Sequence, residues 1–162
     1  MTTVKGPLTC VFLCLLAAAA PSEAGTTKGT GAKFNDSATG TLPSAVKGGQ
    51  SYDCPLTVST PGLNGWPATV EVKLKSRCWA DLWGNTTIAT LNRDVQMNTT
   101  SVTFNATVYV KKVQAKLVGT GDLWWEVKVT PWNMCPLPSW MRPKSMVVDT
   151  FSTSVVKFTV TK

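Results

Sequence analysis

The residue types that carry out most hydrolytic and metal chemistry are scarce in this chain. It contains no histidine, which excludes Ser-His-Asp and Cys-His nucleophile systems and the usual zinc sites. The nine acidic residues are scattered, and no spacing favours a catalytic pair. Asp81 and Glu126, for example, would have to meet across a cleft to hydrolyse a glycoside. We find no glycine-rich phosphate loop and no calcium-binding run of carboxylates. The sequence therefore predicts a protein that is not an enzyme, with no cofactor and no catalytic or metal site.

Seven tryptophans are the most distinctive side chains. Trp125 shares the phase of Leu123 and Val127 in an alternating stretch, which predicts a core position. Most of the others lie on the outward phase or in loop-like segments. Exposed indoles could stack on sugar rings or anchor a protein partner, or they could fold back and cap the ends of the domain. The candidate ligand-binding residues are Trp83, Trp124, Trp132 and Trp140.

A second candidate site is a basic stripe formed by Lys73, Lys75 and Arg77. These residues are two positions apart, so they share one face of a strand. The net charge of +7 also favours an anionic partner such as a sulfated polysaccharide. The alternative is that outward lysines only deter edge-to-edge pairing of strands. No motif indicates a nucleic-acid partner.

Residues 1–24 are predicted to be a secretory signal peptide. Lys5 precedes an apolar run over residues 8–20, and Ser22 and Ala24 place small residues at the −3 and −1 positions of a cleavage site. The apolar run is short for a membrane span, so a retained N-terminal anchor is the alternative that we favour less. We expect an extracellular protein, or a periplasmic or cell-surface protein if the source is bacterial, with no transmembrane segment after cleavage.

Three cysteines remain after such cleavage, so one disulfide and one left-over thiol are expected in an oxidising compartment. We favour a bridge between Cys78 and Cys135, because each follows an apolar strand pattern. A bridge between Cys54 and Cys135 is the alternative. In the favoured case Cys54 is buried, or it joins another chain in a disulfide-linked dimer.

Four Asn-x-Ser/Thr triplets are candidate glycosylation sites if the source is a eukaryote. Serine and threonine are abundant enough to produce one or two such triplets by chance, so four is a mild excess. The acceptor residues are Asn35, Asn85, Asn98 and Asn105.

Alternating apolar residues predict strands rather than helices. The alternation is clearest over residues 68–76 and 102–110. Its phase flips at Lys111-Lys112, which predicts a bulge, a turn or a change of sheet. Residues 113–118 and 123–129 flank a short loop with two glycines and are predicted to pair as a hairpin.

The remaining segments set the domain limits. Residues 25–50 are rich in small and polar side chains and are predicted to be a flexible leader. Residues 51–162 then form the folded domain. Short strands separated by turn signals predict an all-β fold, a two-layer antiparallel β-sandwich of immunoglobulin-like type with about seven strands.

These patterns favour a secreted, non-catalytic module that acts by protein–protein contact, in adhesion, structure or ligand binding. One alternative is a carbohydrate-binding module that uses the exposed tryptophans. Another is a small secreted inhibitor or effector that binds through the Pro- and Trp-rich loop over residues 131–143. The partner is accordingly expected to be an extracellular protein or a carbohydrate.

Overall fold

The computed structural model describes residues 23–78, 86–132 and 148–161. This part of the chain is built almost entirely of extended segments, with one helix of four residues and one 3-10 turn. In chain order the elements are β1 (Ala24–Thr30), β2 (Ser37–Pro43), β3 (Ala45–Lys47), β4 (Ser51–Ser59), η1 (Pro61–Leu63), β5 (Ala68–Arg77), β6 (Thr87–Val95), β7 (Ser101–Tyr109), α1 (Lys112–Ala115), β8 (Thr120–Pro131), β9 (Asp149–Ser152) and β10 (Val156–Thr161). Within these residues no helix has the length and apolar character needed to span a bilayer.

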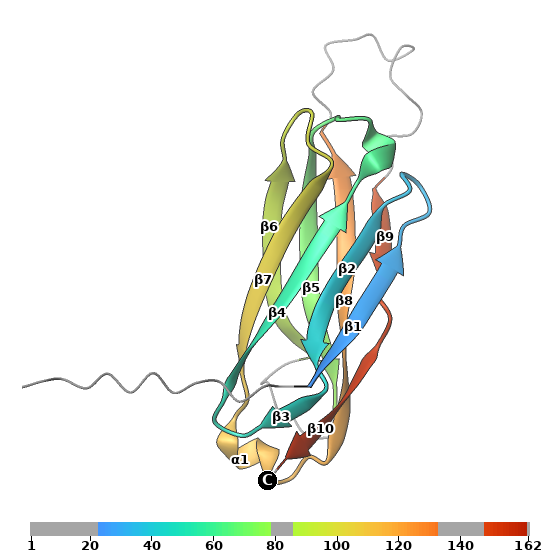
Figure 1. The fold of residues 1–162 in the computed structure, drawn as a ribbon. Helices are drawn as coiled ribbons and strands as arrows, with labels where there is room; N and C mark the ends of the chain where they lie inside the picture. The colour runs from blue at the N-terminus through green and yellow to red at the C-terminus, as the bar shows by residue number, and fades with distance from the viewer. Residues whose placement is uncertain (1–22, 79–85, 133–147, 162) are drawn as a thin grey trace, which may run out of the picture.

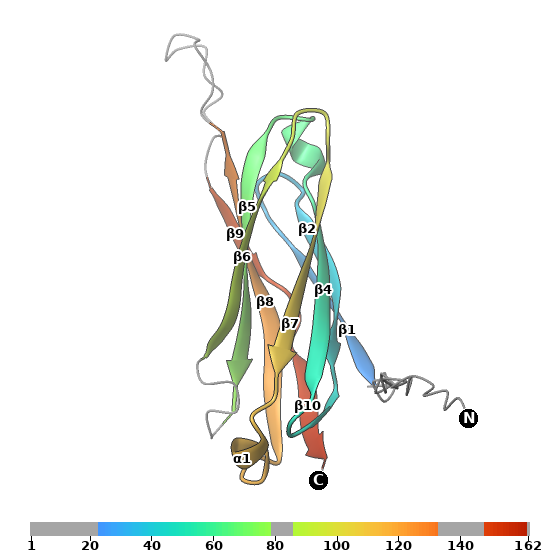
Figure 2. The ribbon, with the colours of Figure 1, turned by 90° about the vertical axis from the view of Figure 1, so that its left-hand side faces the viewer.

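The strands form two sheets that pack face to face (Figures 1 and 2). One sheet has the order β1-β2-β4-β7, and the other has the order β3-β10-β8-β5-β6, with β9 paired to the second half of β8. Apolar side chains from both sheets fill the space between the two layers. The predicted two-layer β-sandwich is therefore confirmed.

The strand order is of immunoglobulin-like type. Strands β2, β4 and β7 correspond to the A-B-E strands of that fold, and β10, β8, β5 and β6 correspond to G-F-C-C′. The predicted number of about seven strands is wrong, because ten are described. Pairing is antiparallel except between β3 and β10, which run parallel.

The prediction of a flexible leader over residues 25–50 is also wrong. This segment forms β1, β2 and β3, and its three largest apolar residues, Phe34, Leu42 and Val46, are all buried in the core. The composition was misleading because β1 and β2 pair over seven residues through their backbones, and backbone pairing needs few large side chains.

The strands with the clearest alternation were predicted well. In β7 the side chains of Phe104, Ala106 and Val108 are buried, while the residues between them are exposed. In β5 every second side chain from Ala68 to Ser76 is buried. The two-residue period of each strand therefore sets which face meets the opposite sheet.

The strand and hairpin predicted for residues 113–118 are wrong. The segment forms α1 and the turn after it, and it carries the chain from β7 in one sheet to β8 in the other. Val113 and Leu117, four residues apart, are exposed together, whereas Ala115 and Val118 are buried. A change of sheet was one of the three outcomes predicted at Lys111-Lys112, and that outcome is confirmed.

Candidate functional site at the base of the sandwich

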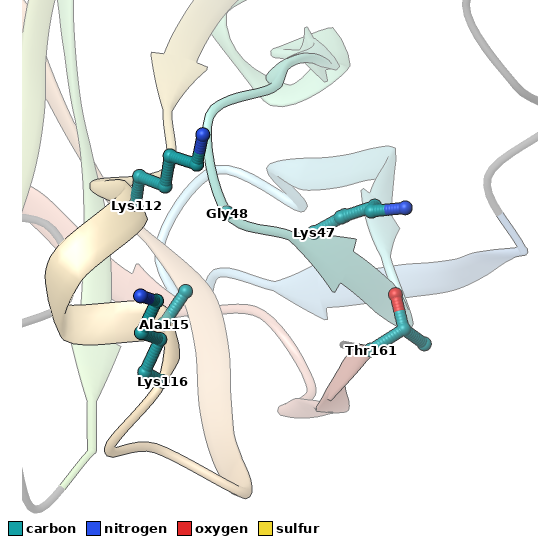
Figure 3. A pocket seen from close by; sticks show the side chains of 6 residues that line it. All are labelled: Lys47, Gly48, Lys112, Ala115, Lys116 and Thr161. Carbon is teal, nitrogen blue, oxygen red and sulfur yellow. The ribbon is translucent and has the colours of Figure 1, made fainter.

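A cavity of about 440 Å³ opens at the end of the sandwich that carries α1, at the lower end of Figure 1. We call this end the base. The cavity lies between α1 on one side and the ends of β3 and β10 on the other, as Figure 3 shows. Its lining residues are Lys47, Gly48, Lys112, Ala115, Lys116 and Thr161.

The walls of this cavity are held in place by close backbone packing. A Cβ atom on Gly48 would lie 2.7 Å from the Cβ of Ala115 and 3.1 Å from the Cα of Lys112, so only glycine lets the chain approach α1 this closely. The next residue, Gly49, has a φ of 84° and donates its amide to the carbonyl of Val110, at 2.8 Å. The tight turn after β3 therefore fixes where α1 sits.

Positive charge dominates the lining of the cavity. Lys112 and Lys116 extend from the α1 side and Lys47 from the β3 side (Figure 3). Within the described part of the chain, none of these three ammonium groups forms an ion pair with a carboxylate. The described lining includes no acidic residue, so the cavity favours an anionic group.

Large apolar side chains are exposed on the α1 segment and at the end of β7. Val113 and Leu117, which flank the α1 lining residues in sequence, are 71% and 58% exposed. Tyr109 is 56% exposed, and its hydroxyl lies 4.0 Å from the position of a Cβ on Gly49. We call these three side chains, together with the cavity, the base surface. Sequence reasoning missed it because residues 113–118 looked like a strand, although the doubled lysine and the phase flip marked its position.

The predicted basic stripe does share one face of β5, but its charges are compensated. Each cation lies beside a carboxylate on β5 or β8. The pairs are Lys73 Nζ–Glu71 Oε1 at 3.0 Å, Lys75 Nζ–Glu126 Oε2 at 3.5 Å and Arg77 Nη2–Asp122 Oδ2 at 2.8 Å. Such neutralised cations offer little attraction to a polyanion, so the structure gives the stripe no support as a polyanion site.

The structure does not bring the candidate tryptophans together. Trp132 is half-buried and donates its indole N–H to Thr69 Oγ1 at 2.9 Å, while its carbonyl accepts the indole N–H of Trp66 at 2.9 Å. These contacts fasten Trp132 to the end of β5. Trp124 is half-buried on the outward face of β8. Trp83 and Trp140 lie outside the described residues.

Three of the four candidate glycosylation acceptors have exposed positions. Asn35 and Asn98 lie in turns with φ values of 51° and 66°, and Asn105 lies on the outward face of β7. Exposure on a turn or an edge leaves room for a glycan, and glycosylation stays a prediction at these three positions. Asn85 lies outside the described residues.

The cysteines lie in different environments. Cys54 is on the inward face of β4 and fully buried, and burial, reinforced by the neighbouring charge of Asp53, raises the pKa of its thiol to about 12. A thiol in this position cannot reach another chain, so the structure does not support a dimer joined through Cys54. Cys78 directly follows β5 and is partly exposed. Cys135 lies outside the described residues.

A second cavity, of about 890 Å³, lies at the end of β5 and the start of β8. Its lining carries charges of both signs, because Arg77 forms an ion pair with Asp122 and Lys157 lies nearby. Its lining includes Cys78, and the next residues in the sequence, 79–85, are outside the described ranges. The net charge of its described lining is smaller than that of the base cavity, and we do not treat it as a site.

Two buried carboxyl groups lie beneath the turn that joins β1 to β2. Neither oxygen of Asp36 has a hydrogen-bond partner among the described residues, and Asp149 Oδ2 accepts the amide of Lys33 at 2.9 Å. Burial, with a further contribution from the charge of Asp149, raises the pKa of Asp36 to about 6. Among the described residues, no three His, Cys, Asp or Glu side chains are grouped as metal ligands would be. The expectation that the chain has no metal site stays a prediction.

Comparison with known proteins gives one structural similarity. No protein-family model matches the chain, and no curated protein matches it. Among solved structures, it is similar to a chain of the complex between zinc 2-glycoprotein and prolactin inducible protein from human seminal plasma. The TM-score is 0.44 and the sequence identity 15%, over 74% of this chain and 89% of that chain. A similarity of this degree says nothing about the function of this chain.

Proposed function

We propose that this chain is a secreted, non-catalytic module that acts by contact with another protein, and that the base surface makes this contact. The observation that carries the proposal is the exposure of Tyr109, Val113 and Leu117 on the end of β7 and on the α1 segment, part of which also lines the cavity. Exposed apolar side chains that gather beside polar groups mark interaction surfaces, whereas single exposed ones do not.

Several features of the chain support this proposal over its alternatives. The predicted signal peptide supports secretion, and the absence of histidine from the sequence supports a non-catalytic role. A sugar-binding surface of stacked tryptophans has less support, because Trp132 is tied to Thr69 by its indole N–H. The loop over residues 131–143 lies mostly outside the described residues, so the inhibitor hypothesis gains no structural support.

Capture of partner proteins from the extracellular fluid of the source tests the proposal. The purified protein is immobilised, and bound proteins are quantified for the natural sequence and for the double variant Val113→Asp, Leu117→Asp. The control is the double variant Met97→Asp, Val155→Asp. These two apolar residues are also exposed, by 65% and 51%, but they do not belong to the base surface.

We expect a defined partner to bind the natural protein and the control double variant. The same partner should not bind the double variant at Val113 and Leu117. An aspartate placed at the centre of an apolar contact leaves a desolvated charge without a partner, which typically costs several kcal/mol. Equal retention by all three proteins would show that the base surface is not the contact. Turnover of a substrate that depends on an acidic residue would show that the chain is an enzyme.

A further inference from the structure

We propose that the cavity at the base binds a carboxylate side chain of an acidic peptide segment, and that Lys47, Lys112 and Lys116 hold it. This inference rests on the proposed function and names the chemistry of the partner. The segment would carry its carboxylates beside at least one large apolar side chain, which would pack on the neighbouring part of the base surface.

Charge distinguishes the lysines of the cavity from the cations of the predicted stripe. The three cations on the stripe are already paired with carboxylates. The three lysines of the cavity are not paired with any described carboxylate. They come from two elements, β3 and the α1 segment, so the fold brings together charges that are more than sixty positions apart in the sequence.

The size and polarity of the cavity also suit a carboxylate side chain. A cavity of about 440 Å³ is within the range of about 300–1,000 Å³ that is typical of small-ligand pockets, so it has room for one or two side chains. Its lining also includes Gly48 and the methyl group of Ala115. The cavity therefore combines ammonium groups with apolar surface, which suits a carboxylate at the end of an aliphatic stem.

The surroundings of the cavity fit a peptide better than a sulfated polysaccharide. A polysaccharide carries many charges along its length and no large apolar side chains, so it fits a long basic stripe. Here three unpaired lysines line one cavity rather than a long stripe, and the exposed Val113 and Leu117 belong to the same α1 segment that lines it. A segment with both acidic and apolar side chains complements both halves of this surface.

Fluorescence anisotropy with a labelled hexapeptide tests the inference. The probe has four glutamates around a central Leu-Phe pair, and a second peptide has lysine in place of each glutamate. The key variant is Lys47→Glu, Lys112→Glu, Lys116→Glu. The matched control is Lys28→Glu, Lys128→Glu, Lys157→Glu, which changes the net charge equally at three exposed lysines on the strands.

We expect the acidic peptide to bind the natural protein, the lysine peptide not to bind, and Kd to rise at least about tenfold in the cavity variant. The control should change Kd by less than about threefold, because exposed charges beyond about 10 Å are screened at 0.1 M salt. The glutamine variant Lys47→Gln, Lys112→Gln, Lys116→Gln should weaken binding in the same direction, and it keeps the test valid if charge reversal prevents folding.

If the cavity variant and the control variant bind the acidic peptide equally weakly, the attraction comes from net charge alone, and the inference is overturned. Binding of a heparin hexasaccharide that depends on the three lysines, without binding of the acidic peptide, would overturn it in favour of a sulfated glycan. Failure here is distinguishable from failure of the proposed function. If the peptide does not bind but partner capture still depends on Val113 and Leu117, the contact stands and only its acidic chemistry is rejected.

Discussion

The charge of Asp149 acts on the buried carboxyl group of Asp36 beneath the turn between β1 and β2. The two side chains are 3% and 0% exposed, and burial together with this repulsion raises the pKa of Asp36 from 3.8 to about 6. The folded protein therefore binds a proton at this site at pH values where the unfolded chain has released it. Stability from this group is fully present below pH 3.8 and is lost as the pH rises through about 6.

The substitution Asp36→Asn is expected to remove this pH dependence. Because one pKa unit corresponds to about 1.4 kcal/mol, the natural protein should lose about 2–3 kcal/mol of unfolding free energy between pH 4 and pH 7 from this group. Urea unfolding at several pH values measures the loss. The variant should be less sensitive to pH over this range, whereas Asp94→Asn, a change at an exposed carboxyl, should keep the natural profile. An unchanged profile in Asp36→Asn would refute the assignment.

Cys78 and Cys135 are expected not to be joined within one chain. Cys78 follows Arg77, which pairs with Asp122 at one end of the β5–β8 ladder. Trp132 donates its amide to the carbonyl of Pro67 at the other end of this ladder. For a strand of this length, the two ends are about 30 Å apart. Three further residues reach at most about 11 Å, and a disulfide needs Cα atoms within about 7 Å.

Peptide mapping of the unreduced, monomeric protein checks this expectation. A linked pair of peptides that contain Cys78 and Cys135 would contradict the strand register. Mapping of a reduced sample under the same digestion identifies both peptides separately and serves as the control.

Cys54 is expected to resist alkylation in the folded protein. Its side chain is fully buried and its pKa is raised to about 12, so almost no reactive thiolate is present at neutral pH. Iodoacetamide labelling followed by mass spectrometry should modify Cys54 only after denaturation. Labelling of Cys54 in the native state, at a rate comparable to that in urea, would show that β4 does not pack as described.

Gly48→Ala is expected to destabilise the base of the sandwich. The added methyl group would lie 2.7 Å from the Cβ of Ala115, so α1 must move away from β3, at a cost of about 1–3 kcal/mol. Gly119→Ala is the matched control, because nothing lies within 4 Å of a Cβ at that position. Thermal unfolding of the two variants measures the difference. Equal melting temperatures would mean that β3 and α1 are not in close contact.

The sequence determined the main strands through local periodicity. In β5 and β7 apolar side chains occur at every second position, and such a strand buries one face whatever it packs against. The inward position of Trp125 followed from the same rule and is confirmed. The sandwich could be predicted for this reason, because strands with one apolar face must pair and then pack against a second layer.

The tertiary structure decided which polar segments join the fold and where charges meet. Residues 25–50 contain few large apolar side chains. Their order comes from backbone pairing of β1 with β2, of β2 with β4 and of β3 with β10, which composition does not encode. The compensation of Lys75 by Glu126 across β5 and β8, and the gathering of Lys47 with Lys112 and Lys116, likewise depend on strand register and on the path of the chain between sheets. A single sequence carries no direct record of such long-range neighbours, because periodicity reports only which face of a segment is buried.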